Sequence, residues 1–208
     1  MQYKKIIFCD FDGTITAEDT LEGFIQQFIT EDIRLLGHEM AQKGYTVKRG
    51  IKEMMAMIPS DKYEAGTEYF RRIRLREGFA AFLDRAAELG IPVVVLSGGI
   101  RDMTELVLAP YRDKILDLWA GKVDLSGEHV RFYSDFETET ELVGKVNIIK
   151  GYDCEHVICI GDSYTDVEMA LYAGEVYARD RLAAALEKMG RSYCTFETFY
   201  DIIERLKE

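Results

Sequence analysis

The sequence predicts an α/β protein with a doubly wound parallel sheet and a small helical domain inserted after the first strand. Three short apolar runs, each ending in Asp or in Ser and Gly, have the composition of strands buried on both faces: Lys4–Asp10, Ile91–Gly99 and His156–Asp162. Helical patterns separate these runs. Such alternation of strands and helices is typical of a parallel sheet that is covered by helices on both sides.

Residues 16–75 interrupt this alternation. They contain several helical patterns and no strong pattern of a buried strand; the helical patterns cover residues 21–29, the stretch around Met40, residues 51–58 and residues 62–73. We therefore expect a helical domain at residues 16–75 and an α/β core domain formed by residues 1–15 and 76–208.

The remainder of the core is predicted to contain further helices and a hairpin. Apolar residues at helical spacing predict helices at residues 79–89, 103–108, 164–172 and 181–189. Residues 119–133 predict a β-hairpin that turns at Ser126, Gly127 and Glu128.

Composition and charge indicate which classes of partner the protein binds and in which cellular compartment it works. The chain has 208 residues and a formal net charge of −11, which disfavours nucleic acid and anionic membrane surfaces as partners. Its apolar runs are too short for a membrane helix or a secretion signal. The four cysteines form no Cys-x-x-Cys pair, which favours reduced thiols in a cytoplasmic protein.

Polar residues follow all three predicted strands. They are Asp10 and Asp12 after the first strand, Ser97, Gly98 and Gly99 at the end of the second, and Asp162 and Asp166 after the third. In an open parallel sheet, ligands bind beyond the carboxyl ends of the strands. We therefore expect these residues to share one site.

Asp10 and Asp12 belong to the segment DFDGT. Residues two apart in an extended chain point the same way, so both carboxylates can face the site while Phe11 turns into the core. Two carboxylates about 4 Å apart repel each other by about 4 kcal/mol at an effective dielectric constant of about 20. A divalent cation or a shared proton relieves this repulsion, and oxygen ligands favour Mg²⁺ over Zn²⁺. The alternative is an ordinary turn rich in Asp and Gly.

Asp162 and Asp166 belong to the segment GDSYTD. Asp162 ends a strand and Asp166 follows one helical turn later, so both can face the same point. Ser163 with Asp166 three residues on also has the spacing of a capping box, and the two roles are compatible.

Two further elements could contact an anion. The hydroxyl of Ser97 and the amides of Gly98 and Gly99, just before a helix, can form an anion cradle. Lys145 precedes another helical run, but an isolated lysine is usually solvated. Two basic clusters are expected on solvated helix faces and not against the substrate: Lys48, Arg49 and Lys52, and Arg71, Arg72 and Arg74.

These segments together resemble the four motifs of the haloacid dehalogenase (HAD) superfamily, over essentially the whole chain. The segment DFDGT is similar to the first motif, Ser97 to the second, Lys145 to the third, and Asp162 with Asp166 to the fourth. The resemblance implies a Rossmann-like HAD core. The helical insert is similar to the small cap of the branch that contains the phosphoserine phosphatases.

The resemblance also implies a mechanism. In it Asp10 is the nucleophile that forms an aspartyl phosphate, and Asp12 is the general acid and base. Mg²⁺ is held by Asp10, the backbone carbonyl of Asp12 and Asp162, and Asp166 either binds the metal directly or holds one of its ligands. The substrate and its phosphate contact Thr14, Asp19, Ser97, Gly98 and Lys145, with Asp19 as the contact nearest the cap.

The implied substrate is a small-molecule phosphate monoester. Phosphoserine phosphatases usually have Glu where Asp19 stands and Arg near Ile51, so phosphoserine is disfavoured. Segments 10–16, 76–79, 96–99 and 161–170 are most similar to the methionine-salvage phosphatases of that branch. A phosphoserine phosphatase, a mutase or dehalogenase on the same scaffold, and a binding module without activity stay open as alternatives. The sequence does not determine the oligomeric state.

Overall fold

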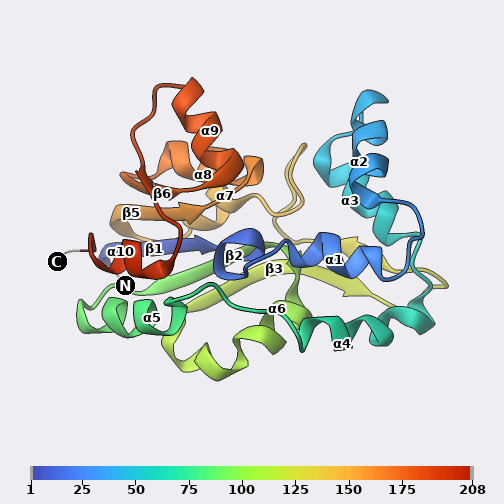
Figure 1. Ribbon diagram of the computed structural model, residues 1–208, viewed down its shortest axis with the longest axis horizontal. Coiled ribbons are helices and arrows are strands. Elements are labelled where there is room, and N and C mark those ends of the chain that lie inside the picture. Colours follow the sequence, from blue (N-terminus) through green and yellow to red (C-terminus); the bar gives the residue numbers. More distant parts are fainter. Residues whose placement is uncertain (1, 207–208) are drawn as a thin grey trace.

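A seven-stranded sheet forms the centre of the protein, whose computed structural model describes residues 2–206 (Figure 1). The strands are β1 (Tyr3–Asp10), β2 (Val93–Ile100), β3 (Asp117–Asp124), β4 (Arg131–Tyr133), β5 (Cys154–Gly161), β6 (Glu175–Ala178) and β7 (Cys194–Thr195). Their spatial order is β4-β3-β2-β1-β5-β6-β7. β4 is antiparallel to β3, and the other neighbouring pairs are parallel. The central strand β1 therefore lies where the chain changes its direction of winding, which is the expected place for a ligand site.

Helices cover both faces of the sheet. Successive side chains of β1 point to opposite faces and therefore pack in two separate clusters. Ile6 and Phe8 pack in one buried cluster with side chains from α7 (Lys145–Ile149), α8 (Val167–Tyr172) and α9 (Asp180–Lys188). Ile7 and Cys9 pack in a second cluster with α5 (Phe79–Glu88) and α10 (Phe199–Ile203). Between β2 and β3 the chain forms α6 (Arg101–Leu108) and the short helix η3 (Ala109–Lys114). Figure 1 shows α7, α8 and α9 on one side of the sheet and α5 on the other.

The segment between β1 and β2 is helical. It contains α1 (Thr20–Gln26), α2 (Ile33–Gln42), α3 (Val47–Met55), the short helix η2 (Ser60–Gly66) and α4 (Thr67–Phe70). The chain enters and leaves the segment side by side, since Thr16 and Leu75 form an isolated antiparallel bridge. The division into a cap at residues 16–75 and a core at 1–15 and 76–208 stays a prediction.

The doubly wound α/β fold predicted from the sequence is confirmed. The three strands that the apolar runs predicted are β1, β2 and β5, and the predicted hairpin pairs β3 with β4. The short strands β6 and β7 were not predicted. Within residues 2–206, no helix has both the length and the apolar composition to cross a bilayer. The four cysteines are free thiols, as expected.

The helical segment has a dense aromatic centre around Phe24. This side chain is fully buried, and its ring centroid lies 5.2 Å from that of Phe28 and 5.5 Å from that of Tyr63. Gly66 lies directly against it: a Cβ at this position would be 2.2 Å from Phe24 Cε2. A methyl group there would therefore displace a ring that has no free space around it.

We predict that Gly66→Ala destabilises the protein, because overpacking a core costs about 1–3 kcal/mol. The control is Gly37→Ala on α2, where a Cβ would meet no atom within 4 Å and where a helical alanine stabilises by roughly 0.5–1 kcal/mol. Urea unfolding of both variants measures the difference. Equal free energies of unfolding for the two variants would show that the Phe24 cluster is loosely packed.

Candidate active site

The loop that follows β1 carries two carboxylates. Asp10 ends the strand and is 3% exposed, Phe11 turns into the core, and Asp12 is half-buried. The side chains therefore alternate as the sequence predicted. Gly13 has a φ of +82°, and a Cβ at this position would lie 2.6 Å from Asp162 Oδ2. Glycine is required here both for the backbone conformation and for the close approach of Asp162.

Arg76 holds the same loop from the other side. Its guanidinium donates hydrogen bonds to the carbonyl oxygens of Gly13 at 2.5 Å, Thr14 at 2.9 Å and Thr16 at 3.3 Å. Sequence reasoning gave Arg76 no role, because a single arginine has no spacing pattern. The resemblance of segment 76–79 to related phosphatases was the only signal.

Lys145 lies between two buried carboxylates at the carboxyl end of the sheet. Its Nζ is 2.5 Å from Asp10 Oδ1 and 2.5 Å from Asp166 Oδ1, and the three side chains are at most 5% exposed. Burial disfavours the ammonium, but the charges of Asp10 and Asp166 outweigh burial and raise the pKa of Lys145 above its ordinary value. The structure therefore brings Lys145 into the site as a permanent cation, in contrast to the usual solvated lysine.

Two carboxylates of the site, those of Asp10 and Asp162, have a raised pKa. Burial, followed by the charge of Asp166, raises the pKa of Asp10 well above its ordinary value, although Lys145 acts in the opposite direction. Burial and Asp166 also raise the pKa of Asp162 from 3.8 to about 6. Since Lys145 carries a single positive charge, the ionised carboxylates of Asp10, Asp162 and Asp166 would together carry more negative charge than it offsets.

Asp162 and Asp166 are fixed by local hydrogen bonds. Asp162 Oδ1 accepts a hydrogen bond from Thr14 Oγ1 at 2.9 Å. Asp166 Oδ2 accepts from the backbone N–H groups of Asp162 at 3.1 Å and Ser163 at 3.0 Å, and it closes the capping box at the start of the short helix η4 (Tyr164–Asp166). Asp166 therefore caps a helix and contacts Lys145 at the same time. The predicted capping box is present, and the role of Asp166 at a metal site stays a prediction.

The acidic cluster fits a divalent cation. Asp10, Asp162 and Asp166 each offer a carboxylate oxygen, and these oxygens lie within 4.8 Å of one another. Asp10 Oδ2 is buried and accepts no hydrogen bond from any group in residues 2–206. Oxygen ligands of this kind suit a hard cation such as Mg²⁺, which would also offset the excess negative charge. The Asp12 carboxylate is not in this group. The expected ligand from Asp12 was its backbone carbonyl oxygen.

β2 is irregular where Ser97 lies. Leu96 and Ile100, four residues apart, pair with Trp119 and Gly121, two residues apart, so residues 97–99 bulge out of the ladder. Ser97 Oγ donates to Asp12 Oδ2 at 2.8 Å and accepts from the Gly99 N–H at 2.8 Å. Sequence analysis expected Ser97 and Gly98 to face a phosphate. The structure places Ser97 against Asp12 and Gly98 in the wall of the adjoining cavity.

A cavity of about 390 Å³ connects the carboxylates to the helical segment. Asp10, Asp12 and Gly98 line it from the sheet, and Asp19 lines it at the start of α1. Asp19 reaches solvent there, yet the surrounding chain desolvates its carboxylate and, together with the charge of Asp12, raises its pKa to about 7. The rest of the wall is largely apolar and includes Ile25, Ile33, Met40, Val47, Ile51 and Met54, and the charged residues Glu22, Arg34 and Arg181 also line it. One end of the cavity is thus acidic, and the walls toward α2 and α3 are apolar.

Sequence analysis also missed Thr20. This first residue of α1 is 1% exposed, and its hydroxyl donates a hydrogen bond to Asp12 Oδ1. Thr20 lies outside the predicted motifs, so no residue pattern pointed to it.

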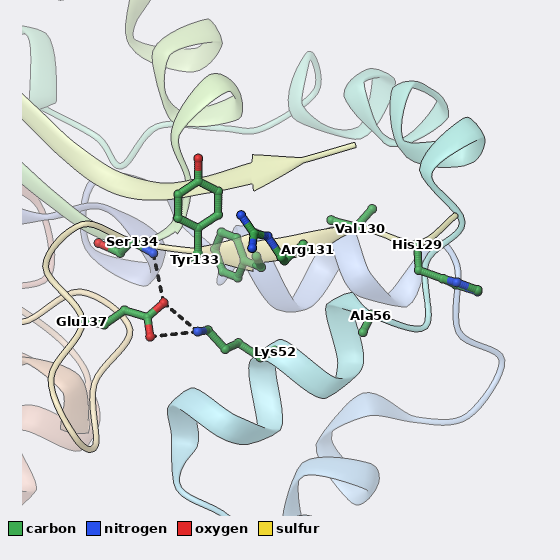
Figure 2. Close-up of a pocket in the computed structure, with 9 residues that line it drawn as sticks. Lys52, Ala56, His129, Val130, Arg131, Tyr133, Ser134 and Glu137 are labelled. Atoms are coloured by element: carbon green, nitrogen blue, oxygen red, sulfur yellow. Dashed lines mark hydrogen bonds and ion pairs between the residues drawn. The ribbon is translucent and has the colours of Figure 1, made fainter. Parts of the chain in front are cut away.

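The expectation that Lys48 and Lys52 lie on a solvated helix face is wrong. Figure 2 shows Lys52 of α3 directed at Glu137, 2.6 Å from its Oε1, and the same carboxylate accepts from the Ser134 N–H at 3.2 Å. The Lys48 side chain is 19% exposed and donates to the Thr138 carbonyl oxygen. Both lysines tie α3 to the loop that leads to Lys145. Lys52 borders a second cavity, of about 470 Å³, which is also lined by residues of β4.

The sequence pattern of the haloacid dehalogenase-like hydrolases matches residues 7–171 of this chain. The chain belongs to the haloacid dehalogenase-like hydrolase family. The match spans β1, β2, β5 and the loops that carry Asp10, Ser97, Lys145 and Asp162. The resemblance inferred from the four motifs is therefore confirmed.

Relatives in this HAD family cover nearly the whole chain. The chain is 38% identical over 204 residues to a 2-hydroxy-3-keto-5-methylthiopentenyl-1-phosphate phosphatase of Microcystis aeruginosa, covering 97% of both chains. It is 31% identical to the phosphatase of the same name from Brevibacillus brevis, covering 100% of this chain and 97% of the relative. The expected kind of enzyme, a HAD-type phosphatase, agrees with these relatives.

Solved structures with a similar fold include phosphoserine phosphatases. One in its apo form has a TM-score of 0.73 at 18% identity, covering 98% of this chain and 100% of that chain. A substrate-bound complex has a TM-score of 0.71 at 18% identity and covers 100% of both chains. At this identity the likeness confirms the HAD fold and carries no information on the substrate.

We predict that the metal-free protein loses stability relative to Asp162→Asn as pH rises from about 4 to about 7. The pKa of Asp162 is about 6 in the folded protein and near 3.8 when unfolded, so the folded state holds the extra proton in this window. Stability falls with rising pH wherever the folded state binds more protons. Denaturant unfolding of the wild type and of Asp162→Asn, in EDTA at several pH values, measures the difference between their free energies of unfolding. A constant or rising difference would show that Asp162 ionises freely.

Proposed function

We propose that this HAD-family enzyme is a Mg²⁺-dependent phosphatase that hydrolyses a small phosphate monoester through an aspartyl phosphate on Asp10. The observation that carries the proposal is the buried cluster at the end of β1, where Asp10 lies 2.5 Å from Lys145, groups with two further carboxylates and lines a cavity. A carboxylate in this position can act as a nucleophile without a base to activate it.

The nucleophile is already oriented. Lys145 holds Asp10 Oδ1, and Asp10 Oδ2 has no hydrogen-bond partner among residues 2–206. Asp10, Asp162, Asp166 and the Asp12 carbonyl would hold Mg²⁺, which when bound supplies positive charge that keeps Asp10 ionised and offsets the charge of the phosphate. Lys145 adds a second, permanent positive charge beside the reacting carboxylate.

The reaction has two half-steps. In the first, an oxygen of Asp10 forms a bond to phosphorus, the ester P–O bond breaks, and Asp12 gives its proton to the leaving oxygen. In the second, water attacks phosphorus, Asp12 takes the proton of that water, and inorganic phosphate leaves as the Asp10–phosphorus bond breaks. The Gly98 amide would supply a neutral donor to the phosphoryl oxygens, as would the hydroxyls of Ser97 and Thr14 once they leave Asp12 and Asp162, to which they donate in this structure.

The cavity favours a substrate with an apolar tail. Ile51 and five other apolar side chains of α1, α2 and α3 line the part that faces the helical segment. A methylthio group is apolar and matches these side chains, whereas the ammonium and carboxylate of phosphoserine would have to pair with the charged lining residues Glu22, Arg34 and Arg181. Together with the names of the relatives, this supports 2-hydroxy-3-keto-5-methylthiopentenyl-1-phosphate as the substrate. Asp19, at the start of α1, is the proposed contact for its polar middle.

The test is a comparison of esters with the purified protein. We expect the methylthiopentenyl ester to have a far higher kcat/KM than phosphoserine, hydrolysis to stop in EDTA, and added Mg²⁺ to restore it. Ile51→Asn should lower kcat/KM for the methylthiopentenyl ester by roughly 10- to 200-fold, the range for losing an apolar pocket contact. The matched control is Leu35→Asn, at an exposed leucine of α2 that does not line the cavity.

Three outcomes would contradict this proposal. Full activity in metal-free buffer would remove Mg²⁺ from the mechanism. Phosphoserine as the best ester would show that the apolar wall does not select the substrate. Equal effects of Ile51→Asn and Leu35→Asn would place the substrate tail elsewhere.

A further inference from the structure

We propose that Thr20 is a positioning residue for catalysis, which holds the Asp12 carboxylate in its working orientation while the phosphate occupies the site. The inference rests on the proposed function, because it concerns the acid of the phosphoryl-transfer steps. It assigns a role to a residue of the helical segment that lies outside the four motifs.

Two hydroxyl groups hold the Asp12 carboxylate, one on each oxygen. Thr20 Oγ1 donates to Asp12 Oδ1, and Ser97 Oγ donates to Asp12 Oδ2 at 2.8 Å. The two donors come from different parts of the chain, α1 and β2. Together they fix the carboxylate plane, which neither hydrogen bond could do alone.

The Ser97 hydroxyl cannot serve Asp12 and the phosphate at once. A hydroxyl has one proton to donate, and in this structure Ser97 gives that proton to Asp12 while it accepts from the Gly99 N–H. When Ser97 donates to a phosphoryl oxygen, it releases Asp12 Oδ2. That release leaves the oxygen free to exchange a proton with the leaving group or with water, and it also removes half of the support of Asp12.

Thr20 has no second partner of this kind in the proposal. Both side chains are buried, Ser97 at 0% and Thr20 at 1% exposed, and neither residue is among the described residues that line the cavity, so burial does not distinguish them. The distinction is one of role: Ser97 is the residue expected to donate to the phosphate, so the hydrogen bond of Thr20 to Asp12 Oδ1 is the one that persists when Ser97 turns to the phosphate. Thr20 then becomes the remaining side-chain contact that orients the acid.

The start of α1 is itself firmly held. Asp19 Oδ1 accepts from the Glu22 N–H at 2.9 Å and caps the helix, and the Asp19 carbonyl accepts from the Gly23 N–H at 3.2 Å. Leu21 and Phe24, in the same helix, are buried in the larger core cluster. Thr20 is thus anchored on a packed element, as a group that positions another must be.

Leaving-group dependence separates positioning from a merely structural role. Phenyl phosphate and p-nitrophenyl phosphate have nearly the same shape, but phenol has a pKa of about 10, like the tyrosine side chain, and needs a proton as it leaves. p-Nitrophenolate is stable near neutral pH and needs little help. A badly oriented acid slows release of phenol more than release of p-nitrophenol, whereas general loosening of the fold slows both equally.

The experiment measures kcat/KM for both esters with Mg²⁺, because kcat/KM reports formation of the phosphoenzyme and is insensitive to its later hydrolysis. Thr20→Val removes the hydroxyl at nearly constant volume, and Thr20→Ser retains it. The matched control is Thr104→Val in α6, a threonine that is also 1% exposed and whose hydroxyl bonds the Ile100 carbonyl instead. Thr20→Ala replaces Thr20→Val if circular dichroism shows that the valine variant does not fold.

We expect Thr20→Val to lower kcat/KM for phenyl phosphate by about 10- to 100-fold, as misplacement of a catalytic group does, and that for p-nitrophenyl phosphate by less than about 3-fold. Thr20→Ser should recover most of the loss, and Thr104→Val should affect both esters equally. Equal losses on both esters in Thr20→Val, or no recovery in Thr20→Ser, would overturn the inference and leave the proposed function intact. No hydrolysis of either ester by the wild type would overturn both.

Discussion

The buried ion cluster of Lys145 with Asp10 and Asp166 is the interaction on which the rest of the site depends. Three charged side chains that are at most 5% exposed can persist only because they satisfy one another. Removing one partner of such a cluster typically costs about 3–5 kcal/mol, since it leaves an uncompensated buried charge. The cluster therefore fixes the side chain of Asp10, the proposed nucleophile of this HAD enzyme, and the neighbouring loops are built around it. Gly13 allows Asp162 to approach, Arg76 holds the loop after Asp10, and Asp166 caps the helix that follows Asp162.

The two ends of the cavity differ in character. We assign the reaction to the acidic end and the choice of substrate to the apolar wall. Its acidic end is supplied by the sheet, where the carboxylates, Lys145 and the bulge at Ser97 converge. Its apolar wall is supplied by α1, α2 and α3. The helical segment also reaches the chemistry, through Thr20 at the start of α1 and through the ion pair of Lys52 with Glu137, which ties α3 to the loop before Lys145. A change in the apolar wall would thus alter the choice of substrate, whereas a change at Thr20 would act on the proposed acid, Asp12.

Most of the fold could be predicted from the sequence, because buried parallel strands are continuous apolar runs and the residues that end them are polar. The alternation of Asp10, Phe11 and Asp12 followed from backbone geometry alone. β6 and β7 were missed because four and two residues carry no usable pattern. Lys48 and Lys52 were misplaced because their partners lie about 90 residues further on, and Thr20 was missed because no sequence rule tells which hydroxyl a carboxylate will accept. The packed fold determines contacts of this kind, and local composition does not predict them.

The central claim is that Asp10 carries the phosphoryl group, and trapping the covalent intermediate tests it most directly. Protein mixed with Mg²⁺ and p-nitrophenyl phosphate is quenched in acid within a turnover and treated with borohydride, which reduces an aspartyl phosphate to homoserine. Mass spectrometry of the peptide from the end of β1 should then show homoserine at position 10 in the wild type and none in Asp10→Asn, which should also release no phosphate. Turnover without modification at Asp10, or modification of a different residue, would contradict the account.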